Sequence, residues 1–342
     1  MEYHWLTRYN VFFIDRQRID ISKLAQWEVV FEHADRMGML LHFKTQEKEN
    51  DQLLDGGQLW LERKLYYREL IARFGHHLAL QWNLGEGNTN TNAEQQAYVR
   101  FFNEIDPYNH PIVIHADYES QSQVFDSLLH NDCLQGVSLQ SKPMEIFKNT
   151  LDWVEKSKYA HGQRWVVTSD EQLPSSRGLV PDSIDPALDK FRKHALWGNL
   201  MAGGAGIEYF FGYNYVNSDL TCQDFRTREA MWNQSRYALE FFEGIPFWSM
   251  TNTDHLVSGN NHALADASLG TVVVFLRRGG PALVDLSEVS PISNAPYMMH
   301  WYDPRNGGDL HGGLLVYAGE VIDTGNPPTE TSSDWVVLLE AV

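Results

Sequence analysis

The sequence predicts an α/β protein: a (β/α)8 TIM-type barrel that lacks its first one or two units, followed by an antiparallel β-sandwich. Three observations support this fold class. Short apolar segments alternate with amphipathic segments over residues 21–242, a pattern typical of parallel strands joined by helices. No glycine-rich phosphate loop follows the first strand, which disfavours a doubly wound nucleotide-binding fold. Beyond residue 245 the helical period ends, and strand-like runs between Gly and Pro turns predict a sandwich.

The first part of the chain repeats one pattern, in which a helix precedes each strand. Apolar runs predict strands at residues 39–43, 78–84, 111–115, 136–140, 164–168 and 203–211, with a further candidate strand at 11–14. Helical spacing of apolar residues predicts helices at residues 21–36, 59–74, 93–105, 121–129, 144–158, 186–201 and 227–242. A complete barrel has eight units, so the barrel is short at its N-terminus. An open barrel exposes strand edges, and we expect that another copy of the chain could associate there.

The last part of the chain is predicted to be all β. Strand-like runs lie at residues 271–276, 282–286, 298–302, 313–317 and 335–339, and turns rich in glycine and proline separate them. We therefore divide the chain into two domains. We expect residues 1–244 to form the N-terminally incomplete barrel, which would carry any catalytic site, and residues 245–342 to form an accessory β-sandwich.

Composition excludes several classes of function. The 342-residue chain carries a formal net charge of −18 at pH 7, whereas nucleic-acid binding needs clustered Lys and Arg, so no nucleic-acid partner is expected. No apolar run reaches the length of a membrane span, and the first residues lack the pattern of a secretory signal. No compact spacing of metal ligands occurs, so neither a metal nor another cofactor is expected. His76 and His77 follow a helix end and are interpreted as structural.

Polar side chains mark the predicted carboxyl ends of the strands, where barrel enzymes carry their chemistry. In chain order they are His42, Lys44, Glu86, Asn88, His115, Asp117, Gln140, Asp170, Glu171, Glu208 and Tyr209. Sugars need donors and acceptors for their hydroxyls and flat apolar faces for stacking, so this set is typical of a carbohydrate site. Trp82, Trp197, Tyr209 and Tyr213 are candidate stacking platforms, although residues of this kind belong to a protein core more often than to a sugar subsite.

Glu86 and Glu171 are the candidate catalytic pair, because glycoside hydrolysis needs two carboxylates that flank the scissile bond. Glu86 lies between Gly85 and Gly87 at the end of an apolar strand. If that strand is the fourth of the barrel, Glu171 ends the seventh, across the barrel mouth. Glu208 is the reserve nucleophile. The alternative for each glutamate is a strand-end carboxylate that pairs with a neighbouring Arg.

Several motifs resemble one group of proteins. They are Leu80-Gln-Trp-Asn-Leu-Gly-Glu-Gly-Asn88, Leu41-His-Phe-Lys-Thr-Gln-Glu47, Thr168-Ser-Asp-Glu-Gln172, the segment from Trp197 to Gly212, and Trp301-Tyr-Asp-Pro-Arg-Asn-Gly307. The group is that of bacterial glycoside hydrolases of planctomycete or marine type, with apiosidase-like relatives. Its members have a clan-A-like TIM barrel followed by a β-sandwich described as collagen-binding. The resemblance covers nearly the whole chain.

The resemblance implies a retaining hydrolase of plant or algal poly- or oligosaccharides. Glu86 takes the position of the acid/base and Glu171 that of the nucleophile. The clan has Asn directly before the first of these, where this chain has Gly85, so contact with the sugar 2-hydroxyl would pass to Asn83 or Asn88.

The remaining strand-end residues would bind the substrate, namely His42, Lys44, Asn83, Asn88, His115, Gln140, Glu208 and Tyr209. The family is found outside the cell or in the periplasm, but this sequence carries no signal, so the location stays open. The alternative function is that of a catalytically inactive, carbohydrate-binding remnant of such an enzyme. Gly85 and the short barrel motivate that alternative.

Overall fold

The computed structural model describes residues 16–342 except 87–88, 219–220, 222, 291–293 and 320. The chain divides into two compact units. One comprises Met1–Gln140 with Glu155–Val166, and the other comprises Ser141–Val154 with Val167–Val342. The strand predicted at residues 11–14 lies outside the described residues.

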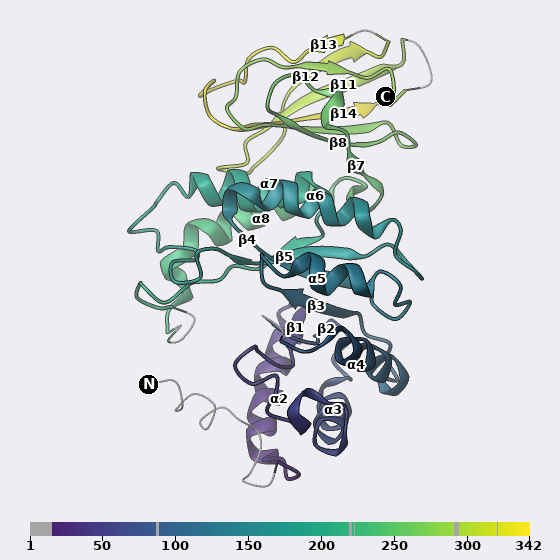
Figure 1. The fold of residues 1–342 in the computed structure, drawn as a ribbon. Helices are drawn as coiled ribbons and strands as arrows, with labels where there is room; N and C mark the ends of the chain where they lie inside the picture. The colour runs from purple at the N-terminus through teal and green to yellow at the C-terminus, as the bar shows by residue number, and fades with distance from the viewer. Residues whose placement is uncertain (1–15, 87–88, 219–220, 222, 291–293, 320) are drawn as a thin grey trace. The chain divides into compact units, whose positions relative to one another are not determined.

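The first unit alternates helices and parallel strands, as predicted (Figure 1). Its elements are α2 (Ile21–Arg36), β1 (Leu41–Lys44), α3 (Leu61–Phe74), β2 (Leu80–Asn83), α4 (Asn92–Ile105), β3 (Ile112–Ala116), α5 (Gln121–Phe125) and β4 (Gly136–Ser141). Strands β1 to β4 pair in parallel in chain order. Each carboxyl end therefore lies at the same edge of the sheet, where the candidate site residues were predicted.

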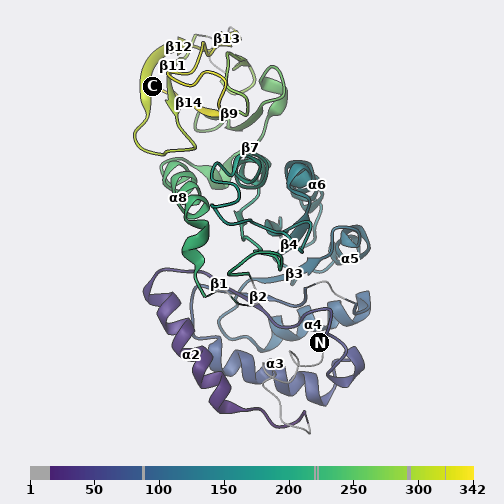
Figure 2. The same ribbon diagram turned by 90° about the vertical axis from the view of Figure 1, so that its left-hand side faces the viewer.

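Aromatic side chains form the core between the first helices and strands of this unit. Phe31 of α2 contacts Phe43 of β1 and Phe74 of α3, with ring centroids 5.5 and 4.9 Å apart. Phe43 in turn contacts Trp82 of β2 at 5.3 Å. Helix α3 packs against both α2 and α4 (Figure 2). The aromatic contacts thus join α2, α3, β1 and β2 into one packed layer.

Helix α4 begins at a capping box. The Thr91 hydroxyl accepts from Glu94 N, and the Glu94 carboxylate accepts from Thr91 N. Two backbone N–H groups that the helix leaves unpaired at its start are satisfied in this way. The cap fixes where the loop after β2 ends.

The parallel order continues with β5 (Val166–Gln172) and β6 (Gly206–Ile207), which pair with each other. Two hydrogen bonds mark the ends of β5. In the first unit Val166 N donates to Gln135 O at 2.9 Å, and in the second unit Leu173 N donates to Ser141 O at 3.0 Å. Helix α6 (Ile146–Ser157) precedes β5, and a π-helical turn η4 (Phe191–Leu196) runs into α7 (Trp197–Met201) before β6.

Short 3₁₀ turns connect several of these elements. They are η1 (Asp55–Gly57), η2 (Asp126–Leu128), η3 (Pro143–Glu145), η5 (Phe225–Arg228), η6 (Phe247–Ser249) and η7 (Asp254–Leu256). The helix predicted at residues 121–129 is thus α5 continued by η2.

Two predicted strands of the parallel sheet differ from the structure by more than two residues at one or both ends. The strand predicted at 164–168 begins at Val166 and runs to Gln172, because its polar end is buried within the sheet. The strand predicted at 203–211 keeps only Gly206–Ile207. There the side chain of Gln172 replaces strand pairing: its Nε2 donates to Glu208 O at 2.8 Å, and its Oε1 accepts from Phe210 N at 3.3 Å.

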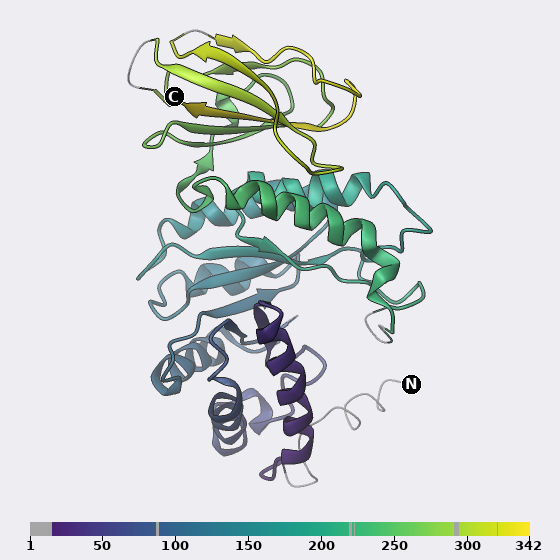
Figure 3. The ribbon, with the colours of Figure 1, turned by 180° about the vertical axis from the view of Figure 1, so that it is seen from behind.

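The C-terminal part of the second unit is an antiparallel sandwich, as the sequence predicts (Figure 3). Its large sheet has the order β12-β11-β14-β9-β8-β7, and β10 pairs with β13 in a second, small sheet. The strands are β7 (Thr251–Asn252), β8 (His262–Asp266), β9 (Thr271–Leu276), β10 (Leu283–Asp285), β11 (Pro296–Tyr302), β12 (His311–Tyr317), β13 (Val321–Asp323) and β14 (Trp335–Ala341). Strands β7, β8 and β13 were not predicted.

Both faces of the large sheet are apolar over its central strands. Val272 and Val274 of β9 belong to the core shared with the small sheet. Val273 and Phe275, which alternate with them, pack with Trp197 of α7 and with residues of α8 (Glu229–Glu243). The sandwich and these helices therefore share one core within the second unit. Among the described residues, no helix combines the length and apolarity needed to cross a membrane.

Candidate functional site

Glu86 follows β2 at the carboxyl edge of the first unit. Its backbone N–H donates to Gln46 O at 3.1 Å, which fixes the loop after β2 against the loop after β1. Lys44, the last residue of β1, places its Nζ 3.1 Å from Glu86 Oε1. Each of these two side chains is 20% exposed, so the ion pair is partly open to solvent. Lys44 and Glu86, both predicted as site residues, are thus in direct contact.

Asn83 organises the polar groups behind Glu86. It is fully buried, and its Nδ2 lies 3.0 Å from His42 Nε2 and 3.1 Å from Ser138 Oγ. Since an amide nitrogen only donates, the His42 nitrogen accepts. The Asn83 Oδ1 accepts from Gly85 N at 3.2 Å, which holds the residue directly before Glu86. The structure therefore gives Asn83 a positioning contact within the protein.

His115 and Gln140 lie at the ends of the next two strands. Ser138 of β4 extends the network to His115, with Oγ 3.4 Å from the ring Nδ1, and both residues are fully buried. Gln140 is also buried, and its Oε1 accepts from Tyr118 N at 3.2 Å, so it fixes the loop after β3. Ser138 was not predicted from the sequence, although its position two residues before Gln140 places both on one side of β4.

Glu171 is the corresponding carboxylate of the second unit. It lies in β5, is 7% exposed, and its Oε1 accepts a 2.8 Å hydrogen bond from Ser175 Oγ. Asp170 is also buried, but successive strand residues point to opposite sides, so it and Glu171 face different directions. Ser175 was not predicted, because it follows the strand in a loop rich in serine and proline.

Glu208 and Tyr209 follow the short strand β6. The side chain of Glu208 is exposed. The hydroxyl of Tyr209 lies 3.0 Å from Ser235 Oγ of α8, and its ring contacts Trp232 with centroids 5.8 Å apart. Burial raises the pKa of Tyr209 above its usual range. The Tyr209 ring thus packs against α8.

Two of the predicted stacking platforms are core residues. Trp82 and Trp197 are fully buried. The Trp82 Nε1 donates to Asp106 Oδ2 at 3.1 Å, and Trp197 stacks on Phe275 with ring centroids 5.3 Å apart. Neither ring offers a face to a ligand, so both tryptophans are core residues, the interpretation that the sequence favoured over stacking. Asn88 lies outside the described residues.

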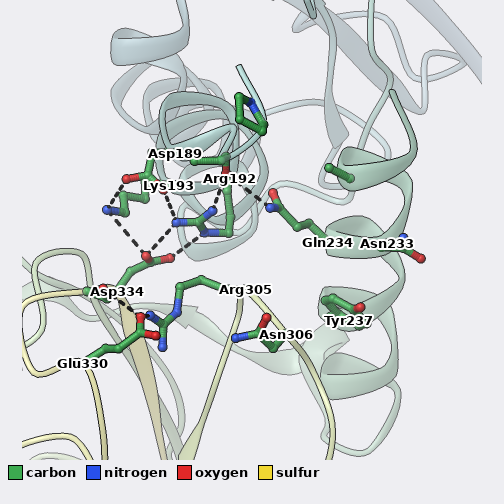
Figure 4. A pocket seen from close by; sticks show the side chains of 14 residues that line it. Asp189, Arg192, Lys193, Asn233, Gln234, Tyr237, Arg305, Asn306, Glu330 and Asp334 are labelled. Carbon is green, nitrogen blue, oxygen red and sulfur yellow. Dashed lines mark hydrogen bonds and ion pairs between the residues drawn. The ribbon is translucent and has the colours of Figure 1, made fainter. Parts of the chain in front are cut away.

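A cavity of about 480 Å³ opens in the second unit beside the helices η4 and α8 (Figure 4). Its wall contains a buried ion pair, in which Arg192 Nε donates to Asp334 Oδ2 and Arg192 Nη2 to Asp334 Oδ1, both at 2.8 Å. Burial disfavours the charge of Arg192, but these bonds hold the pKa of its guanidinium above the ordinary value. The pair is a structural link between η4 and the segment that leads into β14.

Comparisons with known proteins bear on the fold. The family described as "Putative collagen-binding domain of a collagenase" matches residues 246–340. No curated protein matches the chain. A glycoside hydrolase family 5 structure from Bacteroides vulgatus ATCC 8482 is similar at 14% identity and TM-score 0.71, over 93% of this chain and 74% of that chain. A second structure, described as "Glycoside hydrolase", is similar at 16% identity and TM-score 0.72, over 93% of this chain and 77% of that one.

These likenesses establish the architecture. The curled parallel sheet with its helices resembles the TIM barrel of family 5 proteins, and an antiparallel sheet domain accompanies it. The fold class predicted from the sequence is confirmed at this level. In barrels of this kind the chemistry lies at the carboxyl ends of the strands, and Glu86 and Glu171 each lie at such an end.

Proposed function

We propose that the protein is a retaining glycoside hydrolase that cleaves a plant or algal poly- or oligosaccharide. The observation that carries the proposal is the position of two carboxylates. Glu86 follows β2, and Glu171 lies near the carboxyl end of β5, in a fold shared with glycoside hydrolase family 5 proteins. Retaining hydrolysis needs one carboxylic acid and one carboxylate at the scissile bond.

Glu86 is proposed as the acid/base. It donates a proton to the glycosidic oxygen as the bond to the anomeric carbon breaks, and later removes a proton from the attacking water. Its partly exposed side chain and its anchored backbone suit a group that exchanges protons with substrate and solvent. Lys44 is the residue that orients its carboxylate.

Glu171 is proposed as the nucleophile. Its carboxylate attacks the anomeric carbon and forms a glycosyl ester, which water then hydrolyses with net retention. The hydrogen bond from Ser175 Oγ fixes the direction in which this carboxylate points. Its burial further restricts the orientations that the side chain can take.

Substrate binding is proposed for the other polar residues near these strand ends. They are His42, Lys44, Gln140, Glu208 and Tyr209. Asn83 and His115 were predicted with them, but both are fully buried and are proposed to support the site from within the protein. Asn88 was also predicted and lies outside the described residues. In this scheme residues 1–244 are an incomplete catalytic barrel and residues 245–342 the accessory domain. A relationship to apiosidase-like enzymes is part of this proposal.

A panel of plant and algal polysaccharides tests the proposal through the release of reducing sugar. Glu86→Gln and Glu171→Gln should each reduce turnover by at least about 100-fold, as expected for loss of a catalytic carboxylate. Glu119→Gln, an exposed carboxylate after β3, is the matched control and should keep full activity. Full activity in either catalytic variant would refute its assigned role.

An inactive carbohydrate-binding protein is the second candidate, and the Lys44–Glu86 ion pair favours it. The ammonium group at 3.1 Å occupies the carboxylate oxygen that an acid would present to the substrate. Binding of a polysaccharide without release of reducing sugar would support this candidate and exclude the hydrolase.

We also propose that copies of the chain associate through the β1 edge of the parallel sheet. Among the described residues β1 pairs only with β2, so its other edge has no strand partner there. The preceding helix α2 exposes several large apolar side chains, including Trp27 and Val30. An exposed strand edge beside an apolar surface favours association.

A further inference from the structure

We infer that Glu28, His76 and His77 form a binding site for a divalent transition-metal ion, with Zn²⁺ as the ion that fits it best. One carboxylate oxygen of Glu28 and one ring nitrogen of each histidine lie within 4.8 Å of one another. All three residues belong to the first unit, as does Asp35 beside them. The site is independent of the proposed hydrolase activity.

The distances match those between ligands of one tetrahedral ion. Glu28 Oε1 lies 3.0 Å from His76 Nε2 and 3.4 Å from His77 Nε2. Ligands about 2.1 Å from a tetrahedral Zn²⁺ are separated from each other by about 3.4 Å. Two imidazoles and one carboxylate are a ligand set that Zn²⁺ uses in proteins, with water in the fourth position.

Asp35 prepares His77 to act as a ligand. Its Oδ2 lies 2.6 Å from His77 Nδ1 and, as a carboxylate, only accepts a hydrogen bond. The proton of a neutral His77 ring is therefore on Nδ1, which directs the lone pair of Nε2 toward the site. A carboxylate on the second ring nitrogen is the usual partner of a metal-binding histidine.

The other ring nitrogen of His77 makes no hydrogen bond within the described part of the chain. His77 is 1% exposed, and its Nε2 is a buried polar atom there. It faces the carboxylate oxygen of Glu28, so in the neutral ring two electron pairs oppose each other. A cation between them removes this conflict and satisfies both groups.

The surrounding elements hold the ligands in place. Glu28, Phe31 and Asp35 lie on one side of α2 at helical spacing, and the ring of Phe31 contacts that of His77 with centroids 5.7 Å apart. His76 and His77 follow the end of α3, and their rings lie 4.2 Å apart. His76 is half exposed, which gives an ion and a water access from one side. A bound ion would join α2 to the segment that leads into β2.

Calorimetric titration of the chelator-treated full chain with Zn²⁺ tests the inference. We expect one ion per chain, and Co²⁺ in its place should give the intense visible absorption of a four-coordinate site. His76→Gln and Glu28→Gln should each weaken Zn²⁺ binding by about tenfold or more, and Asp35→Asn by about 10- to 100-fold through loss of the orienting contact. Zn²⁺ should raise the Tm of the parent chain and not that of His76→Gln.

Two histidine variants serve as controls. His33→Gln changes an exposed histidine of the same helix, and His161→Gln breaks a surface pair in which His130 Nδ1 lies 3.3 Å from His161 Nε2. Both variants should bind Zn²⁺ like the parent chain. No binding by the parent chain, or binding that persists in His76→Gln and Glu28→Gln, would overturn the inference. Because His76 and Glu28 are partly exposed, these variants are expected to fold, which circular dichroism checks.

Discussion

Lys44 Nζ lies 3.1 Å from Glu86 Oε1, which joins the last residue of β1 to the loop after β2. The contact sets the direction in which the Glu86 carboxylate points. Both candidate functions depend on it, because it either orients a catalytic acid or blocks it. Removing the ammonium group is therefore the most informative single change at this edge of the sheet.

We predict that Lys44→Met lowers kcat/KM for the best polysaccharide substrate by roughly 10- to 100-fold. General acid–base catalysis typically contributes about 100- to 10,000-fold to a rate, and a misdirected acid would lose a part of that contribution. The reason is loss of the contact that orients Glu86. The measurement is initial rates of reducing-sugar release. Lys48→Met is the matched control, since Lys48 lies nearby, is more exposed and pairs with Asp117 instead. An increase in activity in Lys44→Met would show that the ion pair inhibits the acid.

The buried pair of Arg192 and Asp334 leads to a stability prediction. Asp334→Ala leaves the guanidinium of Arg192 at a site where its side chain is 3% exposed, whereas its other carboxylate partner, Asp189, is 58% exposed. Removing one partner of a buried ion pair typically lowers the free energy of unfolding by about 3 to 5 kcal/mol, because the remaining charge stays buried without its partner. We expect a loss of this size in the free energy of unfolding, measured with urea.

An exposed ion pair of the same unit is the control for Asp334→Ala. Arg236 and Glu240 pair at 2.6 Å on α8, with both side chains about half exposed. Glu240→Ala should change the free energy of unfolding by less than about 1 kcal/mol. Equal losses in the two variants would contradict the special role of the buried pair.

The fold was predictable where local pattern decides it. Helix α2 has the predicted bounds, and α4 differs by one residue, because their apolar faces follow the helical period. The end of β5 was not predictable, since Asp170 and Glu171 look like loop residues and are buried only because neighbouring segments enclose them. Strand β8 was not predicted because His-Ala-Leu-Ala-Asp has weak strand propensity.

The candidate site was predictable in outline only. Residues at strand ends could be named, because the end of an apolar run is visible in the sequence. Their hydrogen-bond partners could not be named from the sequence, because the partners lie far apart along the chain: Ser138 is 55 residues from Asn83, and Arg192 is 142 residues from Asp334. The proposed metal site was not predicted from the sequence for the same reason, because Glu28 lies in a helix far upstream of His76 and His77.

Acid should weaken the contribution of Asp303 to stability. Burial alone would raise the pKa of this carboxyl, but hydrogen bonds from Arg305 and Asn306 hold its pKa below the usual range. A lowered folded-state pKa stabilises the protein fully above the unfolded value of about 3.9, and the effect is lost as pH falls through the folded value. The stability gap between the parent chain and Asp303→Asn should therefore be widest near neutral pH and shrink below about pH 4.

Urea unfolding over a pH series measures the gap between the parent chain and Asp303→Asn. Asp309→Asn changes an exposed carboxylate in the same loop between β11 and β12. It is the control and should follow the parent curve at every pH. The prediction would be contradicted if the free energies of unfolding of the parent chain and of Asp303→Asn differed by the same amount from neutral pH down to about pH 3.

Self-association through the β1 edge predicts that apolar residues of α2 control the oligomeric state. Trp27 is 49% and Val30 is 52% exposed, so a charge at either position does not disturb the core of the first unit. We expect Trp27→Lys and Val30→Glu to shift the chain toward monomer in sedimentation equilibrium, because a charge at an apolar contact must lose its water when the contact forms. Leu239→Glu, at a 60% exposed leucine of α8, is the matched control and should leave the mass unchanged. A parent chain that is monomeric over the whole concentration range would rule the association out.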